Sequence, residues 1–359
     1  TSPVINNNGD VAFKVMAIEG VNNQGIWLKT SKDSAGKIVY VAPEERFLTE
    51  PESVSENGAI AFNLYDDGVT DGIFLLDTLT LKVDQVLDPD DLAIQFYTYP
   101  QVKKNGHIYF RATNDNNDRL YHDFYAEKLN TVLAEGVDHQ GLKANYLFKP
   151  AVNDIGQMAF KSRMGEKGKW DEKNPDSIVL LSPSLDSLAP ADKLVTIARD
   201  RDSDPHSPFL GFGNSVSLSK QGHVAFMGIQ LDSKKSIVLA HDNNLRTLAV
   251  EGSNGLSELE LFTPKVNEQD LVLFRAKDRE GKRAIYLANE SGIKRLIGEG
   301  DEVNTDIGVG KILLNPNYPG LGGNVDMNDQ GEIVFHCLLV GLLDNKELGA
   351  AVYKITPKK

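Results

Sequence analysis

The stretch NNNGDVAFK, residues 6–14, returns with variations as NDIGQMAFK at 153–161 and as NDQGEIVFH at 328–336. Each stretch begins with tight-turn residues, because Gly readily adopts the positive φ that a hairpin turn requires. Each then continues into a short apolar run that is typical of a β-strand. Aligned on its Phe, the pattern Asn-x-x-Gly-x-x-Ala-Phe occurs in seven variant copies. The aligned aromatic residues are Phe13, Phe62, Phe110, Phe160, Phe226, Phe274 and Phe335.

Each copy continues with a polar stretch and a further apolar run, such as GIWLK at 25–29 or SIVLAH at 236–241, and the first six copies add one more. A unit of four short strands, repeated about every 50 residues without helical periodicity, predicts an all-β chain folded as a seven-bladed β-propeller with four-stranded blades. We expect one domain over residues 1–359. The predicted blades are about 1–47, 48–96, 97–145, 146–209, 210–260, 261–317 and 318–359.

The chain ends and the repeat intervals add detail to this plan. The last copy stops after its third strand, so the seventh blade is expected either to have three strands or to have lost a fourth with sequence that preceded Thr1. Longer intervals before Phe226 and Phe335 predict insertions near 165–206 and 301–320. The aligned Phe rings are expected to be buried between blades, at roughly 1.5–3 kcal/mol each. The sixth copy has Asp270 in place of Gly, a tolerable residue in the left-handed region.

Composition limits the classes of partner that the chain is expected to bind. The net charge of −13 and the pI near 5.1 argue against a nucleic-acid partner, and no apolar run approaches the roughly 18–20 residues that span a membrane. Cys337 is the only cysteine and is expected to be buried; its neighbour His336 points to the opposite strand face, which argues against a nucleophile–base pair. The chain begins at Thr1 without Met, which favours a processed, secreted or periplasmic protein, although a cloning boundary would look the same. We expect a monomer.

The repeated motif, followed by Gly-Ile and Trp or Phe, resembles that of the bacterial NxxGxxAF tandem-repeat propellers, and its layout is similar to the TolB-type repeat. In architecture the chain looks most like the seven-bladed ulvan lyases, which cleave a uronate-bearing algal polysaccharide by β-elimination. This resemblance implies a secreted lyase with catalytic His and Tyr, a charge-neutralising Arg and, in some members, a structural metal. The alternative is a non-catalytic propeller that binds glycan or protein at the same face.

The residue after each aligned Phe is expected at one shared face, because the second strand of a blade ends where the inner strand begins. A ring of cations there would attract an anionic polysaccharide to an otherwise acidic protein. The alternative is a set of strand-end charges that are solvated or paired with Asp and Glu. These residues are Lys14, Asn63, Arg111, Lys161, Met227, Arg275 and His336, with Arg163 two positions beyond Lys161.

The third copy adds further candidates for β-elimination, which needs a neutralised carboxylate, a base and an acid. Arg111 and Arg275 are candidates for neutralisation, since guanidinium binds carboxylate through two parallel hydrogen bonds. His122 is the candidate base, because imidazole titrates near neutrality. Tyr121 is the candidate acid, with Tyr99 as its alternative.

Substrate contacts in this hypothesis come from aromatic and polar groups on the same face. Simple packing is the alternative for the two tyrosines among them. The predicted substrate-binding residues are Tyr97, Tyr99, Lys161, Arg163, His336, Asn63 and Lys14. His107 and His223 share a repeat position at the opposite end of the second strand, so we exclude both from this site.

Metal signals are sparse. No cofactor is required, and a structural calcium ion is the one candidate. Asp200, Asp202 and Asp204 alternate just before His206, and alternating carboxylates can gather oxygen ligands for calcium; a solvated acidic loop is the alternative. No Cys/His spacing indicates structural zinc. A hydrolase would need a facing carboxylate pair, and Glu50 is the only acid that the pattern places at the inner rim.

Overall fold

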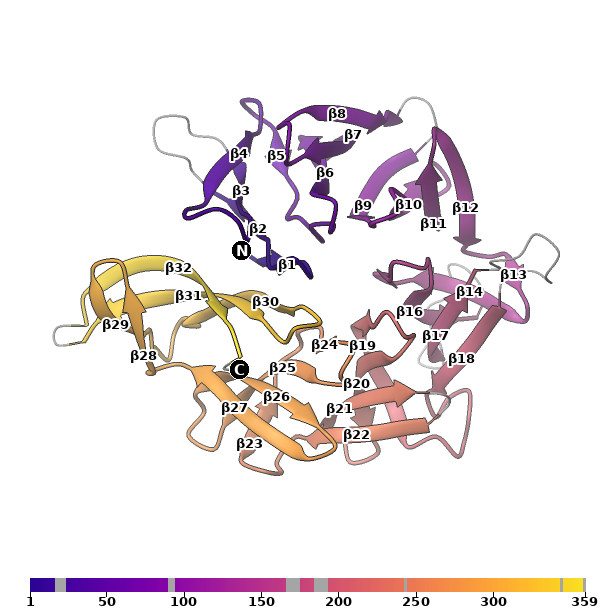
Figure 1. The fold of residues 1–359 in the computed structure, drawn as a ribbon. Helices are drawn as coiled ribbons and strands as arrows, with labels where there is room; N and C mark the ends of the chain where they lie inside the picture. Colours follow the sequence, from indigo (N-terminus) through magenta and orange to yellow (C-terminus); the bar gives the residue numbers. More distant parts are fainter. Residues whose placement is uncertain are drawn as a thin grey trace.

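The computed structural model describes residues 1–16, 24–89, 94–165, 175–183, 193–241, 244–342 and 345–357. These residues form seven β-sheets that stand as blades around a common centre (Figure 1). The arrangement confirms the predicted all-β, seven-bladed propeller. Within the described ranges, no helix is long and apolar enough to cross a bilayer.

Four blades are antiparallel sheets of four strands that follow one another from the centre outwards. The first comprises β1 (Val4–Ile5), β2 (Val11–Val15), β3 (Gly25–Lys29) and β4 (Lys37–Val41). The second comprises β5 (Phe47–Leu48), β6 (Ala59–Asp66), β7 (Val69–Asp77) and β8 (Val83–Leu87). The third comprises β9 (Ile94–Val102), β10 (Ile108–Asn114), β11 (Arg119–Tyr125) and β12 (Lys128–Ala134). The fifth comprises β19 (Phe209–Leu218), β20 (Val224–Gln230), β21 (Lys235–His241) and β22 (Asn244–Val250).

The other three blades have an inner edge built from more than one strand. The fourth comprises β13 (Asp138–His139), β14 (Leu142–Leu147), β15 (Ala151–Val152), β16 (Met158–Met164), β17 (Asp176–Ser182) and β18 (Lys193–Arg199). The sixth comprises β23 (Leu256–Leu259), β24 (Lys265–Val266), β25 (Val272–Asp278), β26 (Arg283–Asn289) and β27 (Gly292–Gly298). The seventh comprises β28 (Glu302–Thr305), β29 (Gly308–Ile312), β30 (Leu321–Met327), β31 (Ile333–Gly341) and β32 (Glu347–Ile355).

Strand pairing shifts three of the predicted blade boundaries. The predicted limits assign residues 138–145 to the third blade, 256–259 to the fifth and 302–312 to the sixth. In the structure these segments pair with β16, β25 and β31, and so belong to the fourth, sixth and seventh blades. Each begins the inner edge of the next blade, and irregular chain between it and the motif hides that continuity in the sequence.

Apart from the β28–β29 hairpin, the seventh blade consists of three strands, β30, β31 and β32. A three-stranded seventh blade was one of the two predicted alternatives. Among the described residues, no strand pairs with the outer edge of β32. The predicted insertion near 301–320 contains the β28–β29 hairpin, which extends the inner edge of β31. In the other predicted insertion, near 165–206, the segments 166–174 and 184–192 lie outside the described residues, and the described part contains β17 and β18.

The aligned Phe residues pack as predicted in six copies, where the ring is at most 2% exposed. Each ring lies against the preceding blade: Phe62 joins a cluster with Ala12 and Val39, for example. Phe13 is only partly buried, stacked on Trp27 at 4.7 Å between ring centroids. Its preceding blade is the seventh, which contributes Val334 and Val352 to the apolar cluster around Phe13.

The first position of the repeated turn links neighbouring blades wherever it is Asn. In these four copies Oδ1 accepts a hydrogen bond from the main-chain N–H four residues later, at 2.9–3.1 Å. The side-chain Nδ2 then donates to the main-chain carbonyl at the same position of the next blade, at 2.9–3.4 Å. The motif Asn therefore closes its own turn and holds the adjacent one. These residues are Asn6, Asn153, Asn267 and Asn328.

Ring closure uses the same contact between the last and first blades. Asn328 Nδ2 donates to the Asn6 carbonyl at 2.9 Å. Asn7 and Asp329 exchange two hydrogen bonds, Asn7 Nδ2 to Asp329 Oδ2 at 2.7 Å and Asp329 N to Asn7 Oδ1 at 2.8 Å. The Ile5 N–H also donates to Asp326 Oδ2 at 3.1 Å. These polar contacts join the chain ends without a strand shared between the two blades.

Replacing Asn328 by Ala should lower the free energy of unfolding by about 2 kcal/mol, because it leaves the Glu332 N–H without its acceptor and removes one of the two donors to the Asn6 carbonyl. Chemical denaturation of the purified variant measures the change. Gln330→Ala, at an exposed position of the same turn, is the control and should change little. Equal stabilities of the two variants would contradict the linking role of Asn328.

Candidate functional site

A central cavity of about 280 Å³ is lined by the inner strands of all seven blades. Four lysines line it, from the third to the sixth blades: Lys103, Lys149, Lys220 and Lys265. Six carboxylates line it as well: Glu50, Glu52, Glu56, Asp154, Asp326 and Asp329. Carboxylates from the second and seventh blades meet two of them. Lys149 pairs with Glu52, and Lys265 Nζ lies 3.2 Å from Asp326 Oδ1. Burial acts to lower the pKa of Lys265, but Asp326 outweighs it and the pKa lies above its ordinary value.

Lys103 differs from Lys149 and Lys265, because its ammonium forms no ion pair with a carboxylate of the described residues. It donates a hydrogen bond to Gln101 Oε1 at 3.4 Å. Burial lowers the pKa of Lys103 to about 8, with Lys265 adding to the shift and Asp154 and Asp326 opposing it. The cavity therefore contains a cation that is poorly solvated and incompletely neutralised.

Lys103 stands at the repeat position that Asn occupies in four other copies. The bond to the next blade is made instead by Gln101, whose Nε2 donates to the Pro150 carbonyl at 2.9 Å. Lys103 is therefore released from the linking role and points its charge to the cavity. The sequence shows Lys103 at a position where four other copies have Asn. The prediction of a cationic face did not include this residue.

The cations that were predicted to form a ring at one face make contacts between neighbouring blades. Lys14, Arg111 and Lys161 each donate to a main-chain carbonyl at the inner edge of the next blade, at 2.5, 3.1 and 3.0 Å. The acceptors are the carbonyls of Leu48, Leu147 and Phe212. Lys161 also pairs with Asp176 at 2.8 Å, and Arg163 holds the same carboxylate through two hydrogen bonds. The alternative of strand-end charges paired with Asp and Glu therefore describes Lys161 and Arg163, whereas Lys14 and Arg111 bond to carbonyls.

Arg275 shows this arrangement in its most buried form, with 2% exposure. Its Nε donates to Glu260 at 2.9 Å, while its two terminal nitrogens donate to the Gly323 and Leu321 carbonyls at 2.6 and 3.1 Å. Its guanidinium carbon lies 3.9 Å from the centroid of the Phe262 ring. Burial lowers the pKa of Arg275 despite its carboxylate partner. Every part of this guanidinium is occupied by the protein.

The remaining residues that follow an aligned Phe are packed among their neighbours. Asn63 is fully buried and its amide donates to the Gly72 carbonyl at 3.3 Å. Met227 is buried within an apolar cluster. His336 lies against Gly322, and burial, with the positive chain terminus, lowers the pKa of its imidazole. Cys337 is buried as predicted, and burial raises the pKa of its thiol to about 12.

The predicted acid and base lie within blade packing. His122 is 4% exposed, and burial lowers the pKa of its imidazole to about 4. Tyr121 is fully buried, donates its hydroxyl proton to the Phe148 carbonyl at 2.6 Å, and has a pKa raised well above its ordinary value by burial. Tyr97 is likewise buried. Tyr99 is partly exposed, with Arg111 and Lys149 at 5.1 and 4.8 Å from its ring centroid.

The structure thus brings Tyr99, Arg111 and Lys149 together but separates the proposed catalytic groups. Arg111 and His122 belong to the third blade and Arg275 to the sixth. None of the predicted catalytic or substrate-binding residues lines the central cavity. Their roles in a lyase stay a prediction.

The predicted calcium segment forms a turn. The Asp200 carboxylate accepts hydrogen bonds from the Asp176 N–H at 2.6 Å and from the Ser203 N–H at 3.2 Å, and burial raises the pKa of Asp200. Asp204 accepts a hydrogen bond from the His206 N–H at 2.9 Å. Asp202 is exposed. Within the described ranges these carboxylates do not gather around one point. Calcium binding here stays a prediction.

Comparisons with known proteins agree with the fold. A family model described as a family of unknown function, DUF7453, matches residues 1–341. No curated protein matches the chain. An acylaminoacyl peptidase from Pyrococcus horikoshii is similar over 100% of this chain and 52% of its own, with 10% identity and a TM-score of 0.58. A puromycin-hydrolyzing peptidase from Mycobacterium tuberculosis is similar over 97% of this chain and 51% of its own, with 8% identity and a TM-score of 0.55.

The chain therefore spans about half the length of these peptidases. TolB from Acinetobacter baumannii matches with 11% identity over 79% of this chain and 65% of its own, at a TM-score of 0.48. At such identities the two peptidases share the fold with this chain and indicate no activity for it.

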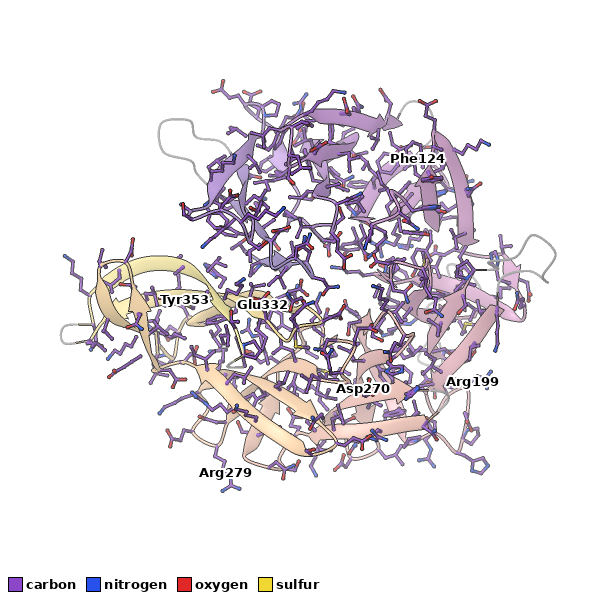
Figure 2. All side chains as sticks on the ribbon, in the orientation of Figure 1. Phe124, Arg199, Asp270, Arg279, Glu332 and Tyr353 are labelled. Atoms are coloured by element: carbon purple, nitrogen blue, oxygen red, sulfur yellow. The ribbon has the colours of Figure 1, made fainter. Side chains whose placement is uncertain are left out.

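Arg275→Ala should lower the free energy of unfolding by about 3 kcal/mol, because it removes the side-chain donor to the Gly323 and Leu321 carbonyls and leaves Glu260 with Arg283 as its ion-pair partner. Denaturant unfolding measures the loss. Arg279→Ala, an exposed arginine of the same blade that points away from the ring (Figure 2), should stay within about 0.5 kcal/mol of the parent. A loss below about 1 kcal/mol for Arg275→Ala would leave Arg275 free for another role.

Proposed function

The chain belongs to the DUF7453 family, whose function is unknown, and we propose from the geometry of its cavity that it is a non-catalytic binding module. Its ligand is a small carboxylate-bearing sugar acid, such as the uronate end of an anionic polysaccharide. The carboxylate is bound by Lys103 in the central cavity. The observation that carries this proposal is the position of Lys103, which lines the cavity, bonds to Gln101 and forms no ion pair among the described residues.

The charge of the ligand follows from the surroundings of Lys103. Burial disfavours the protonated form of an amine, and an opposite charge within a few ångströms restores it. The carboxylates nearest to Lys149 and Lys265 are already paired with them. An incoming carboxylate would therefore gain a charge-assisted hydrogen bond, worth about 1.5–3 kcal/mol, without first breaking an ion pair.

The size of the ligand follows from the cavity. Its volume of about 280 Å³ lies at the lower end of ligand pockets, which span roughly 300–1,000 Å³. A single sugar ring is of this order, whereas several consecutive rings are not. Ser53, Gln101 and Ser217 line the cavity and add neutral polar groups that suit sugar hydroxyls.

A lyase acting on a uronate polysaccharide is the second candidate, carried by the resemblance to ulvan lyases. It would require Arg111 or Arg275 to leave its carbonyl partners before binding a uronate. It would also require His122, with a pKa near 4 and little exposure, to reach a substrate proton. We therefore favour binding. Export to the periplasm or medium and a monomeric state stay predictions.

Lys103→Met should weaken the binding of glucuronate and galacturonate about 10–100-fold, because it keeps the length of the side chain and removes the charge. Calorimetric titration measures the affinity, with glucose as the uncharged probe that should bind weakly to both proteins. The control variant is Lys128→Met, at an exposed position on the outer strand of the same blade.

Uronate affinities that are equal in Lys103→Met and the parent, or the absence of uronate binding by the parent, would contradict the proposal. Incubating the parent with uronic polysaccharides separates binding from β-elimination, which creates an ultraviolet-absorbing double bond in the product. We expect no rise in absorbance. A rise that Lys103→Met retains and His122→Ala loses would favour the lyase.

A further inference from the structure

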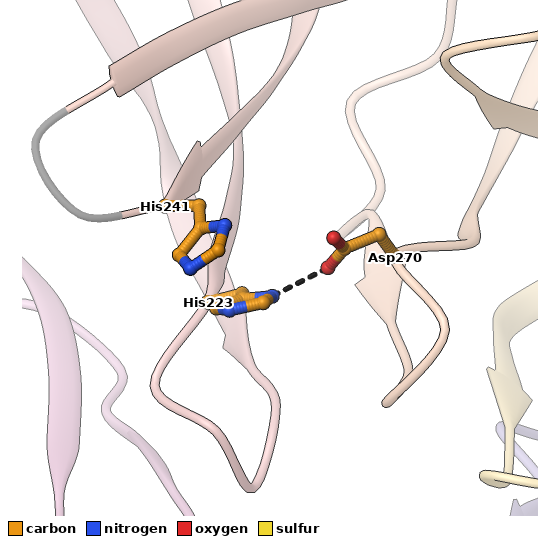
Figure 3. Close-up of side chains that lie close together, drawn as sticks. All are labelled: His223, His241 and Asp270. Atoms are coloured by element: carbon orange, nitrogen blue, oxygen red, sulfur yellow. Dashed lines mark hydrogen bonds and ion pairs between the residues drawn. The ribbon is translucent and has the colours of Figure 1, made fainter.

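Two imidazoles and a carboxylate converge between the fifth and sixth blades, away from the central cavity (Figure 3). One ring nitrogen each of His223 and His241 and one carboxylate oxygen of Asp270 all lie within 4.8 Å of one another. His223 Nδ1 is hydrogen-bonded to the Asp270 carboxylate. The two imidazole rings face each other, with 3.8 Å between their centroids and 36° between their planes.

Three separate elements supply these groups. His223 precedes β20 and is 5% exposed, while His241 ends β21 and is exposed. Asp270 occupies the turn before β25, at the position where the other copies of the motif have Gly, with φ of 57°. A non-Gly residue at positive φ is uncommon. The repeat therefore departs from its pattern at the residue that carries the carboxylate.

The third blade provides an internal comparison. His107 occupies the same repeat position as His223, and its Nδ1 bonds to Asp123 of its own blade at 2.8 Å. It stacks on Tyr125, with 4.1 Å between centroids, at the position where His223 meets the tilted ring of His241. The third blade thus combines one imidazole with a carboxylate. The fifth has a second imidazole, and its carboxylate comes from the next blade.

We propose that His223, His241 and Asp270 bind one Zn²⁺ or a similar borderline divalent ion. Two imidazole nitrogens and a carboxylate oxygen form a ligand set that suits Zn²⁺, and a water completes four-coordination. The site is not expected to prefer Ca²⁺ or Mg²⁺, because these two ions favour oxygen donors. His223 and His241 are contributed by the fifth blade and Asp270 by the sixth, so the bound ion stabilises that interface. This site does not depend on the proposed function of the cavity.

The test is calorimetric titration of EDTA-treated, dialysed protein with ZnCl₂. The parent should bind one Zn²⁺ per chain, and His241→Tyr should bind it at least tenfold more weakly. This variant places at position 241 the residue type that meets His107 in the third blade, so it keeps a ring contact to His223 and the His223–Asp270 bond while removing one ligand. Asp270→Asn should weaken binding as well. His107→Ala removes the equivalent histidine of the third blade and should leave the affinity unchanged.

Two further readouts separate metal binding from a structural effect. Co²⁺ in the parent should give the visible absorption of a four-coordinate site, and His241→Tyr should lose it. Saturating Zn²⁺ should raise the melting temperature of the parent more than that of His241→Tyr. Failure of the parent to bind Zn²⁺ one to one would overturn the proposal. So would equal Zn²⁺ affinity of the parent and His241→Tyr, or a loss of affinity in His107→Ala that matches the loss in His241→Tyr.

Discussion

The hydrogen bond from the motif Asn to the next blade is the constraint on which the ring depends. A propeller blade buries its two faces only against its neighbours, so each copy of the repeat needs groups that fix the adjacent copy. The Asn side chain closes its own turn through Oδ1 and reaches the next turn through Nδ2. At the other end of the same strand, Arg275 and its equivalents reach forward to the next inner edge. Together with the buried Phe, these contacts hold each blade against the next.

This constraint changes where function is sought. Side chains that follow the repeat are occupied by the ring, even when they are Arg, Lys or His. Side chains that depart from it are released. Lys103 replaces the linking Asn and directs an ammonium to the central cavity, and Asp270 replaces the turn Gly and meets two imidazoles. The two departures lie in different blades and have different chemistry, so each defines its own candidate site.

The fold was predictable because its signals are local and repeated. Turn residues, strand lengths and the recurring Phe appear in the sequence at regular intervals, and the left-handed conformation of Asp270 follows from the motif alone. The roles of Arg111 and Arg275 were not predictable, because a sequence does not show which carbonyls lie within reach of a guanidinium. The convergence of His223, His241 and Asp270 was hidden for the same reason, since it requires two blades to meet. Phe13 is partly exposed beside a blade in which no strand of the described residues pairs with the outer edge of β32, and the sequence alone does not show this neighbour.

The most direct test of the proposed role of Lys103 is a pH titration of its ammonium group. NMR of isotopically labelled lysine side chains monitors the titration, and Lys103→Met assigns the signal. Lys103 should titrate with a pKa of about 8 in the free protein, because burial disfavours its charge. Saturating glucuronate should raise that pKa, since the carboxylate stabilises the ammonium, and ligand affinity should accordingly fall as the pH rises above 8. A pKa near the ordinary lysine value of about 10.4, unchanged by glucuronate, would contradict the account.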